Sequence, residues 1–251
     1  MSEIVNFDDI INKGKKIPKM KQKHPMIPTN RYYCILNAPS GSGKTNLLMN
    51  ILFNYLSSYD TLTIICPTYE EKYDYLEEFF TKMQLKLDEK CAKNKCEPYQ
   101  IFRRITDMKA VPDINTYDPH KRNCVIWDDI IAMPKKWKEE VVGPYFIAGR
   151  HSGICYQFLL SQAFFQIPNV IRKQCNGLMT FRDPDDRSIN QMYQIFGTEL
   201  PKKEFKKLYL DCTKKKYNFL CINMEHDFDC GRYCKNLDEV YIPMCLFKVD
   251  E

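Results

Sequence analysis

The sequence predicts an α/β fold, in which helices cover both faces of a mostly parallel β-sheet. Short apolar runs alternate with longer amphipathic segments along the chain, an order typical of parallel β-α-β units. The run at residues 61–66 is β-branched and largely apolar, as a strand covered on both faces would be. The 251 residues, of which 44% are hydrophobic, are enough for one domain with a sizeable core.

The elements follow from this alternation in chain order. Residues 1–30 are rich in lysine, contain prolines and lack periodicity, so we expect a flexible N-terminal arm before a 31–251 domain with a small C-terminal extension from about residue 200. We expect strands at 32–37, 61–66, 99–104, 124–127, 154–160, 177–181 and 217–224, and helices at 44–57, 70–82, 135–148, 169–175, 185–196 and 201–211. The part of the core with the weakest pattern is 84–120, where charges and prolines mix.

A glycine-rich segment, Ala-Pro-Ser-Gly-Ser-Gly-Lys-Thr at residues 38–45, joins the first predicted strand to the first helix. Glycines let backbone N–H groups turn toward phosphate oxygens, and the helix start adds partial positive charge. We expect Lys44 to reach the β- and γ-phosphates of ATP and the Thr45 hydroxyl to be a ligand of Mg²⁺. The expected nucleotide-binding residues are Ala38, Pro39, Ser40, Gly41, Ser42, Gly43, Lys44, Thr45 and Asn46.

Ala38 stands where such loops usually have their first glycine. Alanine is the smallest replacement and loses only the option of a positive φ. We therefore expect the phosphate cradle to survive the change. The alternative for the whole segment is a glycine-rich turn without a ligand.

Two acids, Asp128 and Asp129, follow the apolar run at 124–127. Because the carboxyl ends of parallel strands meet at one edge of a sheet, we expect both acids beside the loop. Asp128 would hold Mg²⁺ through water, and Asp129 would polarise the attacking water, although glutamate is commoner there. The alternative is that the two acids cap the next helix.

Gln162 follows the predicted strand at 154–160 and lies at the same edge. It could reach the γ-phosphate or its attacking water. A buried amide satisfied by the backbone is the alternative. The loop, the acids and this amide together predict a P-loop NTPase of the RecA/ASCE-like type that uses ATP and Mg²⁺.

Two further segments complete an ordered set: Gly-Arg-His-Ser-Gly-Ile at 149–154 and Ser-Gln-Ala-Phe-Phe-Gln-Ile-Pro-Asn-Val-Ile-Arg at 161–172. The set resembles the poxvirus-type DNA-packaging ATPases of large double-stranded DNA viruses and virophage-like elements, in the FtsK/HerA superfamily. The resemblance covers most of residues 31–182. It implies a ring of five or six copies that drives double-stranded DNA into a preformed capsid, docked on the capsid or portal vertex. It also implies a location in the host-cell cytoplasm, at the viral factory, or in the virion.

A ring allows one subunit to complete the site of the next. Charge that develops on the γ-phosphate can be neutralised by an arginine from a neighbour, which would tie hydrolysis to subunit contact. Arg150 is the first candidate for this role and Arg172 is the second. An ordinary ion pair is the alternative for each.

The lysines of this mildly basic chain, with a formal charge of +5, gather in clusters. A motor that moves any sequence would hold DNA through its phosphates, so we expect the lysines of 202–216 or of the N-terminal arm to line the duplex path. Solvated helix faces are the alternative. The clusters are 13–23, 135–138, 202–207 and 214–216.

The twelve cysteines are expected to be reduced, buried thiols. The group Cys221, His226, Cys230 and Cys234 allows a zinc site as an alternative, although its spacing matches no paired Cys-x-x-Cys form. The N-terminus lacks the pattern of a signal peptide, and no run approaches the roughly 18 apolar residues of a membrane span, so we expect a soluble intracellular protein without a membrane partner.

Three other functions use the same residues. A helicase or replication ATPase would share every residue named above. An assembly protein that binds nucleotide without cleaving it stays open because position 129 is aspartate. A small-molecule kinase would need a lid of arginines, for which the chain offers Arg103, Arg104, Arg182 and Arg187.

Overall fold

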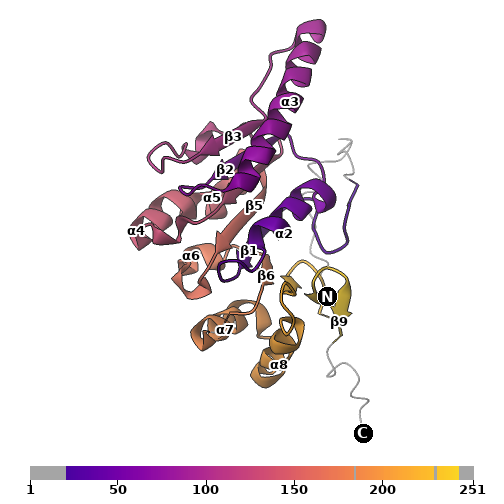
Figure 1. The fold of residues 1–251 in the computed structure, drawn as a ribbon, viewed down its shortest axis with the longest axis vertical. Coiled ribbons are helices and arrows are strands. Elements are labelled where there is room, and N and C mark those ends of the chain that lie inside the picture. The colour runs from indigo at the N-terminus through magenta and orange to yellow at the C-terminus, as the bar shows by residue number, and fades with distance from the viewer. Residues whose placement is uncertain (1–20, 184, 229–230, 243–251) are drawn as a thin grey trace, which may run out of the picture.

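A computed structural model describes residues 21–183, 185–228 and 231–242 of the chain (Figure 1). Within these residues a nine-stranded sheet has the order β3-β2-β4-β5-β1-β6-β7-β8-β9. The strands are β1 (Tyr32–Asn37), β2 (Thr61–Ile65), β3 (Phe102–Ile105), β4 (Asn123–Trp127), β5 (Ile154–Ser161), β6 (Gly177–Thr180), β7 (Leu220–Asn223), β8 (Tyr233–Lys235) and β9 (Glu239–Tyr241). The α-helices are α2 (Lys44–Asn50), α3 (Glu71–Asn94), α4 (Lys135–Trp137), α5 (Gly143–Ala148), α6 (Asn169–Arg172), α7 (Asp186–Met192) and α8 (Lys202–Cys212).

Short wider or tighter helical segments accompany these elements. Wider π-type turns at Ile51–Tyr55, Lys138–Val142 and Tyr193–Gly197 continue α2, α4 and α7. Tighter 3-10 turns lie at Ile114–Thr116, Ile130–Ala132, Gly149–Ser152 and Phe164–Gln166. The continuations account for the length of the helices that the sequence predicts at 44–57, 135–148 and 185–196.

The sheet is mostly parallel, as predicted. All neighbours from β3 to β6 in the spatial order pair in parallel, and β7, β8 and β9 add an antiparallel extension beyond β6. The strand β5 lies between β1 and β4. The carboxyl ends of these three strands therefore meet at one edge of the sheet, which is where ligands bind in open α/β folds.

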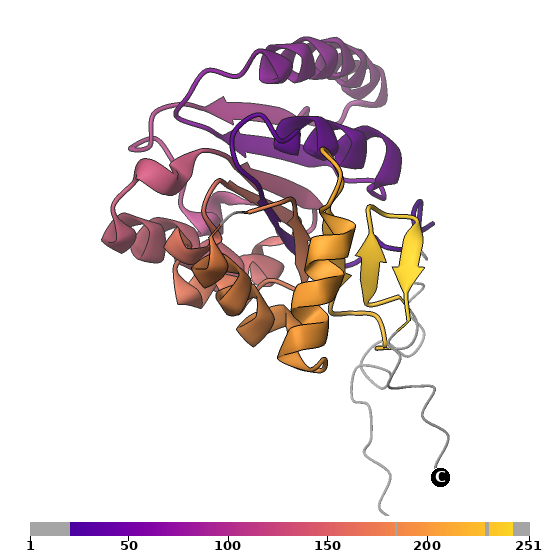
Figure 2. The same cartoon turned by 60° about the horizontal axis from the view of Figure 1, so that its bottom comes forward.

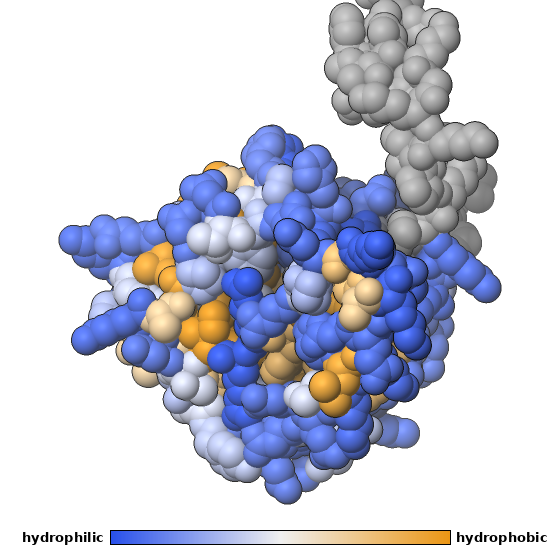
Figure 3. Space-filling model, turned by 90° about the horizontal axis from the view of Figure 1, so that it is seen from above, coloured by the Kyte–Doolittle hydropathy of each residue, from blue (hydrophilic) through white to orange (hydrophobic). Residues whose placement is uncertain are grey.

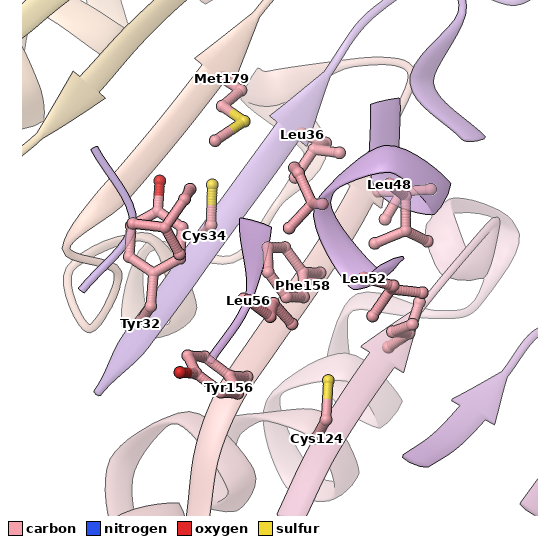
Figure 4. Close-up of a cluster of buried hydrophobic side chains, with 14 of the residues drawn as sticks. Tyr32, Cys34, Leu36, Leu48, Leu52, Leu56, Cys124, Tyr156, Phe158 and Met179 are labelled. Atoms are coloured by element: carbon pink, nitrogen blue, oxygen red, sulfur yellow. The ribbon is translucent and has the colours of Figure 1, made fainter. Parts of the chain in front are cut away.

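Helices cover both faces of the sheet (Figure 2). On β1, the side chains of Tyr32, Cys34 and Leu36 belong to a buried cluster with residues of α2 and α3, while Tyr33 and Ile35 belong to a second cluster with residues of α5 to α8. Figure 4 shows how Leu48 and Leu52 of the α2 segment pack over the strands on the first face. The alternating side chains of a strand thus serve two cores, which explains the continuous apolar runs.

The fold differs from the sequence prediction in several parts, among them α6, which ends at Arg172 and not near residue 175. The helix predicted to end near Lys82 continues to Asn94 as the projecting α3 of Figure 1, because residues 83–94 contain good helix formers and no proline or glycine. The predicted strand at 217–224 is shorter, and only Leu220–Asn223 pairs. The hairpin of β8 and β9 was not predicted; Asn236, at φ 57, lies in its turn.

The packed chain begins before Arg31, where the sequence pattern placed the start of the core. Met26 and Ile27 are 3% and 1% exposed, and the Asn223 side-chain amide donates to the Met26 carbonyl at 3.1 Å. These residues anchor the end of the segment expected to be an arm. Residues 1–20, which hold most of the lysine cluster at 13–23, lie outside the described residues.

The face of the molecule from which α3 projects, seen from above in Figure 3, is mostly hydrophilic and has separate hydrophobic patches. On α3 itself Tyr75, Met83 and Leu85 are exposed. Among the described residues, no helix combines the length and apolar character needed to cross a membrane.

Candidate nucleotide-binding site

The loop after β1 has left-handed backbone at two glycines, Gly41 with φ 73 and Gly43 with φ 93. Side chains with a Cβ rarely adopt this conformation, so these two positions require glycine. Ala38 is not among the described residues with positive φ; it is fully buried and its N–H donates to the Ser161 carbonyl at 2.9 Å. Alanine therefore fits at position 38 without backbone strain, as expected from the sequence.

Lys44 begins α2 and turns back over the loop. Its ammonium donates to the Ala38 carbonyl at 2.6 Å and to the Pro39 carbonyl at 3.4 Å. Burial lowers the pKa of Lys44, while the charges of Asp128 and Asp129 act in the opposite direction. The lysine is thus held in a partly desolvated site facing two acids, where an anionic triphosphate would be strongly attracted.

Asp128 follows β4 and is 9% exposed. The hydroxyl of Tyr73, a fully buried residue of α3, donates to its Oδ2 at 2.6 Å. Burial raises the pKa of Asp128, while this hydrogen bond and the charge of Lys44 lower it. The bond to one oxygen fixes the carboxylate, and the side chain lines the cavity where a metal or its water would bind.

Asp129 has left-handed backbone, φ 52, at the start of the 3-10 turn Ile130–Ala132, but its side chain makes no capping hydrogen bond there. Instead it accepts a hydrogen bond from the Gln162 side chain at 3.4 Å. Gln162 is exposed and does not have the buried, backbone-satisfied environment that was its alternative. The acid and the amide that the sequence expected around an attacking water are therefore in contact.

These residues line one cavity of about 350 Å³ at the carboxyl edge of the sheet. The residues that the sequence predicted and that line it are Ser40, Gly41, Ser42, Gly43, Lys44, Thr45, Asn46, Asp128, Asp129 and Gln162. Thr68, Glu70, Lys72 and Tyr217 line it too and were not predicted. A larger groove of about 940 Å³ between α8 and the β8–β9 hairpin contains none of the loop residues, so the chemistry selects the smaller cavity.

The donors in this cavity fit Mg²⁺. Its preferred ligands are oxygens, usually one or two carboxylates together with phosphate and water. The Thr45 hydroxyl and the buried Asp128 carboxylate are such donors and lie in the same cavity. A cation there would also offset the cost of burying the Asp128 charge.

The two candidate finger arginines have different environments. Arg150 is exposed and lies in the 3-10 turn Gly149–Ser152, at the amino end of β5. The eight residues of β5 separate it from its own Gln162 edge by about 25 Å at the usual rise per residue. Arg172 is 9% exposed, packs over the Phe164 ring at 5.3 Å and donates to the Gln191 side chain.

Arg150 therefore has the exposure that a residue acting on a neighbour needs, whereas Arg172 is part of its own subunit's core. Among the described residues that line the cavity the cations are Lys44 and Lys72, and no arginine is present. The four arginines considered for a kinase lid are thus outside the cavity as well. Arg104 forms ion pairs with Asp74 and Glu77 on α3.

Besides Thr68, Glu70 and Lys72, sequence reasoning missed two tyrosines at the site, Tyr73 and Tyr217. Tyr73 is 55 residues before Asp128, inside an amphipathic helix where an aromatic residue indicates core packing. Tyr217 was assigned to a strand that begins only at Leu220. No spacing rule connects either residue to the loop; their roles depend on the path of the chain in three dimensions.

The proposed zinc group is only partly within the described residues, because Cys230 lies outside them. Cys221 and Cys234 are fully buried partners in the β7–β8 register, and burial raises the pKa of both thiols. Among the described residues no group of three or more histidine, cysteine or acidic side chains could hold a metal ion. The two cysteines are core residues.

Among the described residues, cluster 202–207 lies on α8, 135–138 on α4 and the turn that continues it, and 214–216 in the turn before β7; their lysines are exposed apart from Lys138, which is buried. On α8 the buried side is formed by Phe205, Leu208 and Tyr209, which leaves the lysines exposed. Several lysines form ion pairs: Lys206 with Asp186 at 3.0 Å, Lys135 with Glu139 and Lys136 with Glu140, both at 3.7 Å.

The fold is that of a P-loop NTPase with a candidate nucleotide site. Three features define it: the parallel sheet, the left-handed glycines of the loop after β1, and the two acids after β4, which lies on the far side of β5 from β1. The chain belongs to the poxvirus A32 protein family, because the family model matches residues 26–223. This confirms the resemblance noted in the sequence. No curated protein matches the chain.

Solved structures with the same fold include the genome packaging NTPase B204 of Sulfolobus turreted icosahedral virus 2 in complex with ATP-gammaS, at 14% identity and a TM-score of 0.52, over 77% of this chain and 93% of that one. The DNA-packaging ATPase B204 of Sulfolobus turreted icosahedral virus matches at 13% identity and a TM-score of 0.50, over 79% and 95% of the two chains. The pCW3 conjugation coupling protein TcpA with ATPgS matches at 14% and 0.50, over 88% and 63%.

Proposed function

We propose that this chain is the ATPase of a viral genome-packaging motor, which cleaves ATP and moves double-stranded DNA into a preformed capsid. The observation that carries the proposal is the single cavity in which Lys44, Asp128 and the Asp129–Gln162 pair meet. Membership in the A32 family and the fold shared with packaging NTPases support it.

The residues divide the chemistry among them. Lys44 leaves its loop carbonyls to bind the β- and γ-phosphates, while the loop N–H groups hold the chain of phosphates. Thr45 and Asp128 would hold Mg²⁺, which would neutralise part of the phosphate charge. Asp129 accepts the proton of the attacking water. Gln162, whose amide donates a hydrogen bond to the Asp129 carboxylate, orients that water.

We propose further that Arg150 reaches the γ-phosphate of a neighbouring subunit in a ring of five or six copies. Its distance from its own site and its exposure support this role. Subunits with Arg150→Ala would be mixed with subunits carrying Lys44→Ala. In a trans arrangement some mixed rings regain a complete site and turnover, whereas no recovery at any ratio would contradict the role.

The experiment that tests the function is ATP turnover with and without blunt double-stranded DNA, together with the mass of the oligomer in the presence of nucleotide. We expect turnover that DNA stimulates, that Lys44→Ala abolishes, and that weakens steeply with salt because phosphates are the contacts. Equal turnover with and without DNA would contradict a DNA motor. Strand separation in place of duplex movement would favour a helicase.

The contacts to DNA are proposed for the exposed lysines of α8 and of 214–216, which lie in the chain between α7 and β7. Reversing the charge of this set, with Lys216 left unchanged, should reduce DNA stimulation and leave turnover without DNA unchanged. An unaltered salt dependence after reversal would place the DNA path elsewhere. The capsid or portal vertex as the docking partner and the host-cell cytoplasm or virion as the location belong to the same proposal.

A further inference from the structure

The side of the cavity away from the acids is formed by a residue that no motif contains, Tyr217. Because β7 runs antiparallel to β6, it enters the sheet at the edge where β6 ends, and Leu220 pairs with Thr180. The residues just before β7 are therefore at the carboxyl edge of the parallel strands. This topology brings Tyr217 to the phosphate loop from the side opposite to β4 and β5.

The Tyr217 ring lies on the side of the loop where a side chain at position 43 would project. Its Cδ1 would be 3.4 Å from a Cβ placed on Gly43, so the ring occupies the space that the glycine leaves open. Tyr217 is 58% exposed, whereas a tyrosine that serves only core packing is mostly buried. The ring thus forms a wall that faces both the cavity and solvent.

The backbone of Tyr217 is left-handed, with φ 69, in the turn that Asn218 closes through its N–H to the Lys215 carbonyl at 3.1 Å. This conformation is uncommon for residues other than glycine, asparagine and aspartate, and for a bulky aromatic residue it stores strain. Strain of this kind concentrates at ligand sites. The turn keeps a large ring at the mouth of the cavity. Because the ring is largely exposed, burial does not offset the strain of its backbone.

The remaining lining suits phosphates and not a base. Among the described residues that line the cavity Tyr217 is the one aromatic side chain; the others are loop residues, acids, lysines, a threonine and an amide. A triphosphate that extends from the loop toward Asp128 and Gln162 places its γ-end there. Its nucleoside then emerges on the other side of the loop, where the flat ring is.

We propose that Tyr217 is the base-binding residue of this site, and that its ring stacks on the purine of ATP. The inference rests on the proposed function, since it requires that the cavity holds a nucleoside triphosphate. Aromatic stacking on a base depends on the π-face and not on hydrogen bonds. Lys216, whose ammonium is 4.8 Å from the ring centroid, adds a cation next to the stacked pair.

The test separates the base from the phosphates by comparing two probes, ATP and inorganic tripolyphosphate, bound to the purified chain with Mg²⁺. Tyr217→Asn removes the ring and suits the left-handed backbone, because asparagine tolerates it. Tyr217→Phe keeps the ring and removes the hydroxyl. Tyr75→Asn, a change at a 60% exposed tyrosine of α3 outside the cavity, is the matched control.

We expect Tyr217→Asn to weaken ATP binding by roughly tenfold, the usual effect of losing one stacked base contact. Its tripolyphosphate binding should stay as in the wild type. Tyr217→Phe should bind ATP as the wild type does, and Tyr75→Asn should bind both probes as the wild type does. Unchanged ATP binding by Tyr217→Asn would overturn the inference, and so would an equal loss for both probes, which would mean that the ring only shapes the loop. Failure of the wild type to bind either probe would overturn the proposed function itself.

Discussion

The two sides of β1 supply different kinds of residue to the same cavity. On one side β5 and β4 run parallel to β1, and the residues after their ends are Gln162, Asp128 and Asp129. On the other side β7 runs antiparallel to β6, and the residue at the cavity, Tyr217, comes before its start. The parallel side contributes the groups for which we propose the reaction chemistry, and the antiparallel side contributes the proposed base contact. A sheet of mixed direction can therefore separate chemistry from binding at one edge.

If this division holds, changes on the parallel side lower turnover, while changes on the antiparallel side alter affinity for the base. The largest effect is expected for Asp129→Asn, which removes the proton acceptor and keeps the shape. Turnover should fall by about 10²- to 10⁴-fold, the usual contribution of a general base, with little change in ATP binding. Steady-state ATPase and equilibrium binding measure the two quantities.

Asp211→Asn, an exposed aspartate on α8, is the control for Asp129→Asn and should retain turnover. Full activity of Asp129→Asn would remove the catalytic role and favour a protein that uses ATP only for assembly. A loss of ATP binding equal to the loss of turnover would break the division between the two sides.

A smaller effect is expected for Tyr73→Phe, which removes the hydroxyl that donates to Asp128 and keeps the buried ring. Loss of a residue that orients a metal ligand typically weakens metal binding by about 10- to 100-fold. The Mg²⁺ concentration that gives half-maximal turnover should rise accordingly. Titration of turnover with Mg²⁺ measures this. Tyr69→Phe loses a similar bond, 2.6 Å to Asp74, outside the cavity and is the control.

The same variant has a predicted pH dependence. The Tyr73 hydrogen bond lowers the pKa of Asp128, so its removal raises that pKa further above the ordinary value. Because Asp128 must be ionised to hold Mg²⁺, the acidic limb of the pH profile of turnover should move to higher pH. An identical profile in Tyr73→Phe and the wild type would show that the hydrogen bond has no part in tuning the acid.

The smallest effect is on stability. Burial raises the pKa of Asp128 in the folded chain, so its charged form is less stable folded than unfolded. Asp128→Asn should therefore raise the melting temperature of the nucleotide-free chain at neutral pH, by about 2–4 °C per kcal/mol recovered. The gain should vanish as the pH falls below the unfolded pKa, where the wild-type carboxyl is neutral in both states. A lower melting temperature in thermal unfolding at neutral pH would contradict it.

The sequence predicted the parallel side of the site well for a physical reason. A buried strand must be apolar, so the point at which it ends and polar residues begin is visible in the sequence, and parallel strands place those points together. Asp128, Asp129 and Gln162 are found in this way, and Lys44 from the glycine-rich loop that follows β1; all four share one cavity. Chain order alone, however, did not reveal which strand lies between β1 and β4.

The antiparallel side was not predictable by the same rule. A strand that enters the sheet from the carboxyl edge places the residues before its start at the site, and nothing in residues 217–224 marks their direction. Tyr73 was hidden for a related reason, since a tyrosine on the buried face of α3 has the pattern of a core residue. The second half of α3, after Lys82, and the β8–β9 hairpin were missed because their sequences have weak periodicity.

The conformation of Ala38 bears on how such loops are recognised in other genomes. A text pattern that demands glycine at that place would pass over this chain, even though the backbone there is compatible with any small residue. The constraint that cannot be relaxed is geometric and falls on Gly41 and Gly43 alone. A motif defined by the backbone torsion angles that each position permits would detect divergent members that a fixed residue pattern misses.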